Sequence, residues 1–224
     1  IAVFCSASFE IDPKYNKVAR DFVRAASLRG YGIVSGGTIK GTMGEISDEL
    51  HACGGYHLGV IPRFMEQYVY PDLTEVIWTD TMAQRKTLLR EGTCAVVALP
   101  GGIGTLDEVI ETFALVHLKQ YFGKIFLLNH DGFYEPLRQL LQHYVDTKMM
   151  SEATMAKVVF ASDPEEIIDK LEEQGSDVLV RVCQGIEVTV KNRCLHRAVA
   201  PLAGNLNGRV TLWRMRQKLW LVAL

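Results

Sequence analysis

The sequence of 224 residues lacks any apolar run near the roughly 20 residues that a membrane-spanning helix requires, so we expect no membrane partner. Only five cysteines occur, an odd number, and their spacing matches no standard zinc motif. We therefore predict no metal site, and a reduced, cytoplasmic compartment is the simplest interpretation of these cysteines. The order Gly-x-x-x-x-Gly-Lys-[Ser/Thr] is also absent, so no P-loop is predicted.

The chain also has no marked excess of charge of either sign, since 24 basic and 26 acidic residues give a net charge of −2. This balance hides an asymmetry, because residues 176–224 hold eight basic and two acidic residues, a net +6, whereas residues 1–175 carry −8. We therefore predict a domain at 1–175 and a basic C-terminal extension at 176–224. No nucleic-acid partner is expected.

Three interpretations of this extension stay open. It could form a β-hairpin and a helix packed on the domain, with edge strands at 178–180 and 186–190. It could be a tail that binds a partner or a membrane surface, since residues 210–224 are apolar and basic. It could also be a segment foreign to the fold, and the first and third interpretations are favoured.

Apolar strands and amphipathic helices alternate along the chain. The strands are expected at 1–5, 31–35, 56–61, 75–78, 93–99 and 124–128, and the helices at 13–28, 43–53, 80–91, 106–117, 133–148 and 163–174. Strands that alternate with helices favour a parallel sheet joined by right-handed crossovers. The predicted fold is therefore α/β, a Rossmann-like doubly wound parallel sheet with helices on both faces.

The most informative stretch is a strand, a glycine turn and a helix start at 96–108. Gly101 and Gly102 follow the strand and let a ligand approach the backbone. Thr105 is the predicted N-cap, which places Asp107 and Glu108 in the first turn of the helix. Free N–H groups and the positive end of the helix dipole would then form an anion cradle, with the Glu108 carboxylate beside the bound group.

A second glycine loop at 35–44 also follows an apolar strand and precedes a helix. Two such loops can face each other at the carboxyl ends of neighbouring strands, where open α/β sheets bind their ligands. Lys40 within this loop is a candidate phosphate contact.

These residues resemble the Lonely Guy family, often labelled lysine decarboxylase-like. The family motif Pro-Gly-Gly-x-Gly-Thr-x-x-Glu is matched at every fixed position by residues 100–108, and Met-His-x-Arg-Lys corresponds to residues 82–86. The resemblance covers about residues 1–174. The sequence departs from the family pattern at Thr38, Gln67, Ala83 and Ala114, and these departures concern the choice of base more than the reaction.

The resemblance implies a hydrolase that cleaves the N-ribosidic bond of a nucleoside 5′-monophosphate, such as a cytokinin riboside monophosphate or AMP, to free base and ribose 5-phosphate. It implies that Arg85 and Glu108 are the catalytic pair, that no cofactor is needed, and that the chain forms a homodimer. The residues expected to contact the nucleotide lie in both glycine loops and beside them: Ser8, Gly36, Gly37, Met82, Lys86, Gly101, Gly102, Ile103, Gly104, Thr105, Leu106 and Asp107.

Physical chemistry agrees with these roles, because cleavage builds positive charge on the ribose and a nearby carboxylate stabilises that charge. The planar fork of Arg85 suits a phosphate or ribose hydroxyls better than a lysine would. The plainer alternatives are that Glu108 only complements the helix dipole and that Arg85 is a solvated surface charge. A different class of function, a nucleotide- or cofactor-binding carrier or sensor without turnover, also stays open.

Overall fold

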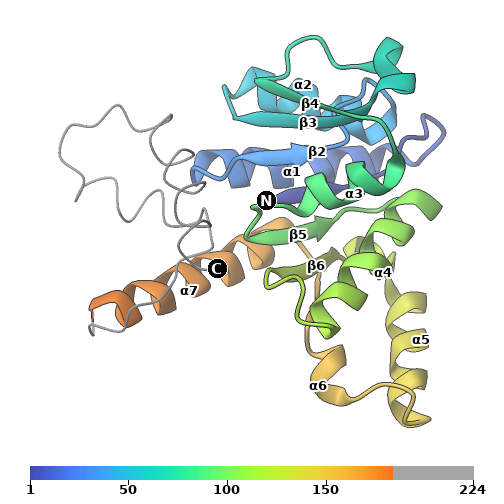
Figure 1. Cartoon of the computed structure of the whole chain (residues 1–224), viewed down its shortest axis with the longest axis vertical. Coiled ribbons are helices and arrows are strands. Elements are labelled where there is room, and N and C mark those ends of the chain that lie inside the picture. The colour runs from blue at the N-terminus through green and yellow to red at the C-terminus, as the bar shows by residue number, and fades with distance from the viewer. Residues whose placement is uncertain (184–224) are drawn as a thin grey trace.

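The computed structural model describes the backbone of residues 1–183 and the side chains of residues 1–173. Its strands form one parallel sheet in the order β4-β3-β2-β1-β5-β6-β7, which confirms the predicted α/β class (Figure 1). The strands are β1 (Ala2–Phe4), β2 (Ile33–Ser35), β3 (His57–Pro62), β4 (Glu75–Thr79), β5 (Ala95–Ala98), β6 (Lys124–Leu128) and β7 (Val158–Ala161).

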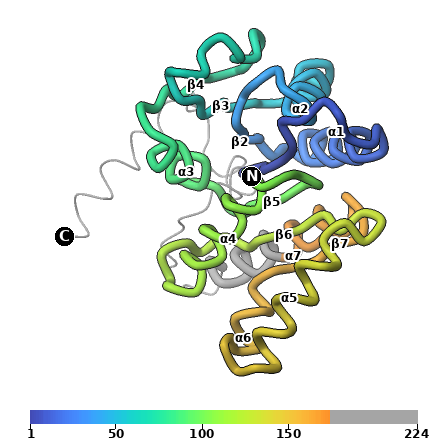
Figure 2. The backbone as a smooth tube through the Cα atoms, turned by 90° about the vertical axis from the view of Figure 1, so that its right-hand side faces the viewer, coloured from blue at the N-terminus to red at the C-terminus, as the bar shows by residue number. Residues whose placement is uncertain are grey.

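Helices cover both faces of this sheet, as predicted (Figures 1 and 2). One face packs against α1, α2 and α7, and the other against α3, α4 and α5. The helices are α1 (Pro13–Leu28), α2 (Gly41–Ala52), α3 (Met82–Arg90), α4 (Ile103–His117), α5 (Glu135–Asp146), α6 (Glu152–Met155) and α7 (Pro164–Cys183), with short 3-10 turns η1 (Arg63–Tyr68) and η2 (His130–Gly132).

The interior strand β5 explains why residues 95–99 of the sequence are all apolar. Val97 is fully buried against the layer of α1, α2 and α7, while Val96 is fully buried against the opposite layer. A strand that is covered on both faces cannot alternate polar and apolar residues. Each fully buried valine contributes about 1.5–3 kcal/mol from apolar burial.

The helix starts are fixed by capping side chains that the sequence displays. In α1, the Asp12 carboxylate accepts a hydrogen bond from the Lys14 N–H at 3.0 Å, and proline occupies the first turn. In α3, the Thr81 hydroxyl accepts from the Gln84 N–H at 3.2 Å, while the Gln84 side chain accepts from the Asp80 N–H at 3.0 Å. These two hydrogen bonds fix the start of α3 and therefore the position of the basic residues that follow.

The secondary structure after residue 148 differs from the prediction. Strand β7 and the short helix α6 were not predicted, because residues 149–161 show no clear period. The helix predicted at 163–174 continues to Cys183, so the edge strand predicted at 178–180 is wrong. The other expectations for the extension, at 186–190 and 210–224, lie outside the described residues.

The order of the strands predicts where this sheet binds a ligand. The chain winds outward from β1 through β2 to β4 in one direction and from β5 to β7 in the other. Such a reversal opens a crevice at the carboxyl ends of the two neighbouring strands, which are β1 and β5. Across residues 1–183, none of the helices has both the length and the apolar character required to cross a membrane.

Candidate functional site

The glycine turn after β5 leads into α4 three residues earlier than predicted. Gly102 is the N-cap and offers no side-chain cap, so the prediction that Thr105 is the N-cap is wrong. Thr105 instead sits one turn inside the helix and lies over Gly101, where an added Cβ would overlap its hydroxyl. Asp107 and Glu108 consequently lie in the second turn rather than in the first.

The start of α4 leaves several polar groups without partners. The first helical bond runs from the Leu106 N–H to the Gly102 carbonyl at 3.0 Å, so the preceding N–H groups of the first turn have no partner within the helix. The Thr105 hydroxyl is buried and has no hydrogen-bond partner among the described residues. Ile103 is 83% exposed, and Gly104 faces open space. An anion could therefore approach the unpaired N–H groups of the first turn from solvent, with the Thr105 hydroxyl buried behind them.

Arg85 and Glu108 form a close and nearly buried ion pair. The Arg85 Nη1 donates to the Glu108 Oε1 at 2.8 Å, and the two side chains are only 12% and 11% exposed. The Arg85 Nε also donates to the Val60 carbonyl at 3.1 Å, which fixes the guanidinium to the end of β3. The structure thus brings together, from separate helices, the two residues that the resemblance names as the catalytic pair, and their role stays a prediction.

The ionisation of Glu108 is governed by opposing influences. Burial raises the pKa of its carboxyl, the Arg85 charge and hydrogen bond lower it, and the net pKa lies above the ordinary value. The folded site therefore increases the proton affinity of the Glu108 carboxylate. Cys5, a free thiol at the end of β1, lies close enough that the Glu108 charge adds to burial in raising its pKa, so Cys5 stays neutral.

A second ion-pair group joins α3 to α4 beside this pair. Lys86 binds both Asp107, at 3.1 Å, and Glu111, and Arg90 binds Glu111 at 2.7 Å. Burial opposes ionisation of Glu111, yet the hydrogen bonds from the two cations lower its pKa overall. The ammonium group of Lys86 is thus occupied by two carboxylates. The roles of Arg90 and Glu111 were missed, although both recur four residues after a predicted site residue.

The first glycine loop lies under the Arg85 side chain. Gly36 is buried directly beneath the guanidinium, while Gly37 has a φ of +62° and packs on the Gly59 backbone. Lys40 is engaged elsewhere, because its ammonium lies 3.5 Å from the centre of the Tyr68 ring in a cation–π contact. The backbone of this loop is therefore what meets the pair.

Buried polar groups support that loop from below. The Ser35 hydroxyl oxygen accepts the Gly37 N–H at 3.0 Å and lies 2.7 Å from the His57 Nε2. Burial lowers the pKa of His57 to about 4, so its ring is neutral and can accept the Ser35 proton. This hydrogen-bond chain was not predicted from the sequence.

The remaining predicted residues are more peripheral. Ser8 is exposed, and its hydroxyl accepts from the Glu10 N–H at 3.1 Å. Met82 is exposed at the start of α3. Tyr134 is an unpredicted neighbour: its buried hydroxyl donates to the Leu99 carbonyl at 2.7 Å and so holds the end of β5 just before the glycine turn.

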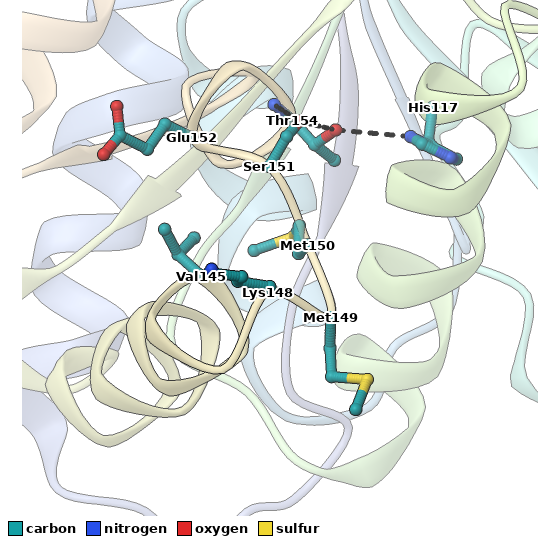
Figure 3. A pocket seen from close by; sticks show the side chains of 8 residues that line it. All are labelled: His117, Val145, Lys148, Met149, Met150, Ser151, Glu152 and Thr154. Carbon is teal, nitrogen blue, oxygen red and sulfur yellow. Dashed lines mark hydrogen bonds between the residues drawn. The ribbon is translucent and has the colours of Figure 1, made fainter.

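Two cavities lie elsewhere on the molecule. The larger, of about 450 Å³, is formed by the end of α4, the end of α5 and the turn into α6 (Figure 3). His117 and Thr154 form a 3.3 Å hydrogen bond at its rim. The smaller, of about 270 Å³, lies between α1 and α2 beside Ile39. Neither contains Arg85 or Glu108. Among the side chains that the structure describes, those of residues 1–173, no cluster of three His, Cys, Asp or Glu residues could bind a metal.

Comparison with known proteins assigns the chain to a family. The family model described as "Possible lysine decarboxylase" matches residues 43–171, more than half of the chain, and this span contains both Arg85 and Glu108. The chain belongs to the Lonely Guy family.

Curated members of the Lonely Guy family cover most of the described chain. A cytokinin riboside 5′-monophosphate phosphoribohydrolase of Mycobacterium tuberculosis is 32% identical over 161 residues, 71% of this chain and 86% of that protein. One of Arabidopsis thaliana is 32% identical over 174 residues, 77% of this chain and 76% of that protein. These relatives support enzyme activity at the level of the family.

Solved structures share the fold at lower identity. A molybdenum cofactor binding protein from Rippkaea orientalis has a TM-score of 0.58 at 22% identity and covers 76% of this chain and 92% of its own. The molybdenum cofactor carrier protein of Chlamydomonas reinhardtii has the same TM-score at 18% identity, covering 76% of this chain and 94% of its own. The Lonely Guy fold thus extends to carrier proteins.

Proposed function

We propose that this chain hydrolyses the N-ribosidic bond of nucleoside 5′-monophosphates, of the cytokinin riboside monophosphate or AMP type, to free base and ribose 5-phosphate. The observation that carries the proposal is the buried 2.8 Å pair of Arg85 and Glu108 beside the open start of α4. A carboxylate and a guanidinium at the edge of an anion-binding helix start are the groups that this reaction needs.

Glu108 is the residue we assign to the chemical step. As the bond from the ribose C1′ to the base breaks, positive charge grows on the sugar, and the Glu108 carboxylate stabilises it in a site of low dielectric. The attacking water gives its hydroxyl group to C1′ and its remaining proton to the carboxylate, and Glu108 then passes this proton to the departing base, which regenerates the carboxylate. Burial raises the pKa of the Glu108 carboxyl and so increases its affinity for this proton, while the Arg85 charge opposes that rise.

The start of α4 is the part we assign to the phosphate. Its unpaired N–H groups and the buried Thr105 hydroxyl are donors, and the helix dipole favours an anion there. Gly104 adds no side chain that would block the approach. The distance along α4 from Thr105 to Glu108 is one helical turn, so a ribose 5-phosphate could span from the donors to the carboxylate.

We also propose a homodimer that uses the exposed apolar residues along α4 and the loop after it. Ile103, Ile110, Leu118 and Phe122 are all exposed, whereas Phe113 is buried in the core. A row of exposed apolar side chains beside a candidate site is typical of a surface that a partner covers. Light scattering coupled to size exclusion tests this proposal, and Ile110→Glu together with Leu118→Glu should give a monomer.

A carrier or sensor without turnover is the second candidate function. Proteins named as molybdenum cofactor carriers share the fold, although their identity to this chain is too low to support more than the fold. A carrier has no need to hold a carboxylate such as Glu108 in a buried site, because desolvation of a charge costs binding energy. The pair therefore favours the enzyme.

The test is release of free base from AMP and from a panel of other nucleoside 5′-monophosphates. Glu108→Gln keeps the shape of the side chain and should lower kcat by about 10²–10⁴-fold, the usual contribution of a general base. Glu49→Gln is the matched control, because Glu49 is equally buried and binds Arg24 at 2.6 Å on the other face of the sheet. Tight nucleotide binding without base release from any monophosphate would instead establish the carrier.

A further inference from the structure

The proposed reaction does not explain why residue 36 is a glycine. The Arg85 guanidinium is fixed at two nitrogens, with Nη1 on Glu108 and Nε on the Val60 carbonyl. Its third nitrogen, Nη2, lies over Gly36, where an added Cβ would overlap it. The same Cβ would lie 2.8 Å from the Sδ of Met43, so the space above Gly36 is filled from two sides.

Backbone conformation does not explain why a glycine stands at this position. Gly37 next to it has a φ of +62°, a value that disfavours other residues, but Gly36 is outside the left-handed region. An alanine could therefore adopt the backbone of Gly36. The requirement at this position is for space, and the group that occupies the space is Arg85.

We propose that Gly36 is a positioning residue: its missing side chain leaves the space in which Arg85 lies flat, and so directs the guanidinium onto Glu108. This proposal rests on the proposed function and adds a role for the first glycine loop in it. The loop then acts on the reaction through Arg85 and not only through contact with the nucleotide.

A side chain at Gly36 has a defined consequence for the pair. The Met43 thioether is flexible and can yield, whereas Arg85 is held at both Nε and Nη1 and must break one of these bonds to move. Glu108 would then remain buried with a weaker partner. Arg85 opposes the effect of burial on the pKa of Glu108, so a weaker contact with Arg85 would raise that pKa further. Glu108 would then become protonated at a higher pH than in the wild type.

The competing explanation is that Gly36 is small only so that the nucleotide can approach the backbone. In that case Gly36→Ala weakens substrate binding and raises KM, while kcat and its pH dependence stay unchanged. The two explanations therefore predict different kinetic parameters for the same variant.

The experiment is a double-mutant cycle of Gly36→Ala and Arg85→Lys, since lysine has no Nη2 to be displaced. We expect Gly36→Ala to lower kcat at least about 10-fold, to change KM less than about 2-fold, and to move the acid limb of the kcat profile to higher pH. In the Arg85→Lys background the same substitution should change kcat less than about 2-fold. Equal effects in both backgrounds, or a raised KM alone, would overturn the proposal.

A control variant and an unfolding measurement complete the experiment. Gly55→Ala is the matched control, because its Cβ would lie 2.6 Å from the Ser27 Oγ, a similar crowding far from Arg85, and kcat should not change. Urea unfolding of all four cycle proteins reports coupling of Gly36 with Arg85 even if the wild type releases no base. This inference predicts that Arg85→Lys relieves the destabilisation caused by Gly36→Ala. The unfolding measurement therefore tests the inference separately from the proposed function, which is tested by release of base.

Discussion

Acidification from about pH 7 to about pH 5 should destabilise the fold through His57 beneath the first glycine loop. The pKa of this ring falls from 6.5 to about 4 on folding, because burial disfavours its charged form. Below about pH 6.5, His57 is protonated in the unfolded chain but stays neutral in the folded chain until the pH approaches 4. The free energy of unfolding therefore decreases as the pH falls. One pKa unit corresponds to about 1.4 kcal/mol, and the loss between these two pH values is about 2 kcal/mol.

The assay is urea unfolding of the wild type and of His57→Gln at both pH values. The glutamine amide oxygen can still accept the Ser35 hydroxyl proton but does not titrate, so the difference between the two proteins isolates His57 from the carboxylates. Acidification should cost the wild type about 2 kcal/mol more than the variant. Equal losses would refute the reasoning, as would an NMR titration of the His57 ring with a midpoint near 6.5.

Three other substitutions test the supports of the site by urea unfolding. Tyr134→Phe leaves the buried Leu99 carbonyl without its 2.7 Å donor and should cost about 1–3 kcal/mol; no change would show that the bond is dispensable. Glu111→Gln removes the anion that pairs with the buried Arg90 and should cost about 3 kcal/mol, and a loss under about 1 kcal/mol would mean that water replaces it. Asp12→Ala should cost about 1 kcal/mol through the lost cap of α1, unless another group caps Lys14.

Local signals in the sequence were sufficient for the strands and helices that flank the site. The apolar run of β5 and the Asp12 and Thr81 caps depend on neighbours within a few residues, so their patterns are visible in the sequence. No local signal shows that Arg85 lies against Glu108, because the two residues are 23 positions apart; the resemblance to the family supplied this pair. Strand β7 is only four residues long and lacks such a signal, which is why it was missed.

The errors at the site have a common physical origin in three-dimensional contacts. Thr105 is a good N-cap residue, yet its side chain lies over Gly101 and the helix begins at Ile103, with Gly102 as an N-cap that offers no side-chain hydrogen bond. The contact of Thr105 with Gly101 in the folded turn overrode this local preference. The role of Gly36 was hidden for the same reason, because the side chain that fills its space comes from a helix far along the chain.

The position of β1 between β2 and β5 has a consequence for how the chain is made. While the ribosome has released only the first half of the domain, β1 can pair with β2 but its other edge stays open until β5 emerges, some 90 residues later. An unpaired edge of buried apolar residues invites association with other nascent chains. Arg85 and Glu108 likewise lie on opposite sides of β5 in sequence, so the pair forms only when this central gap in the sheet has closed.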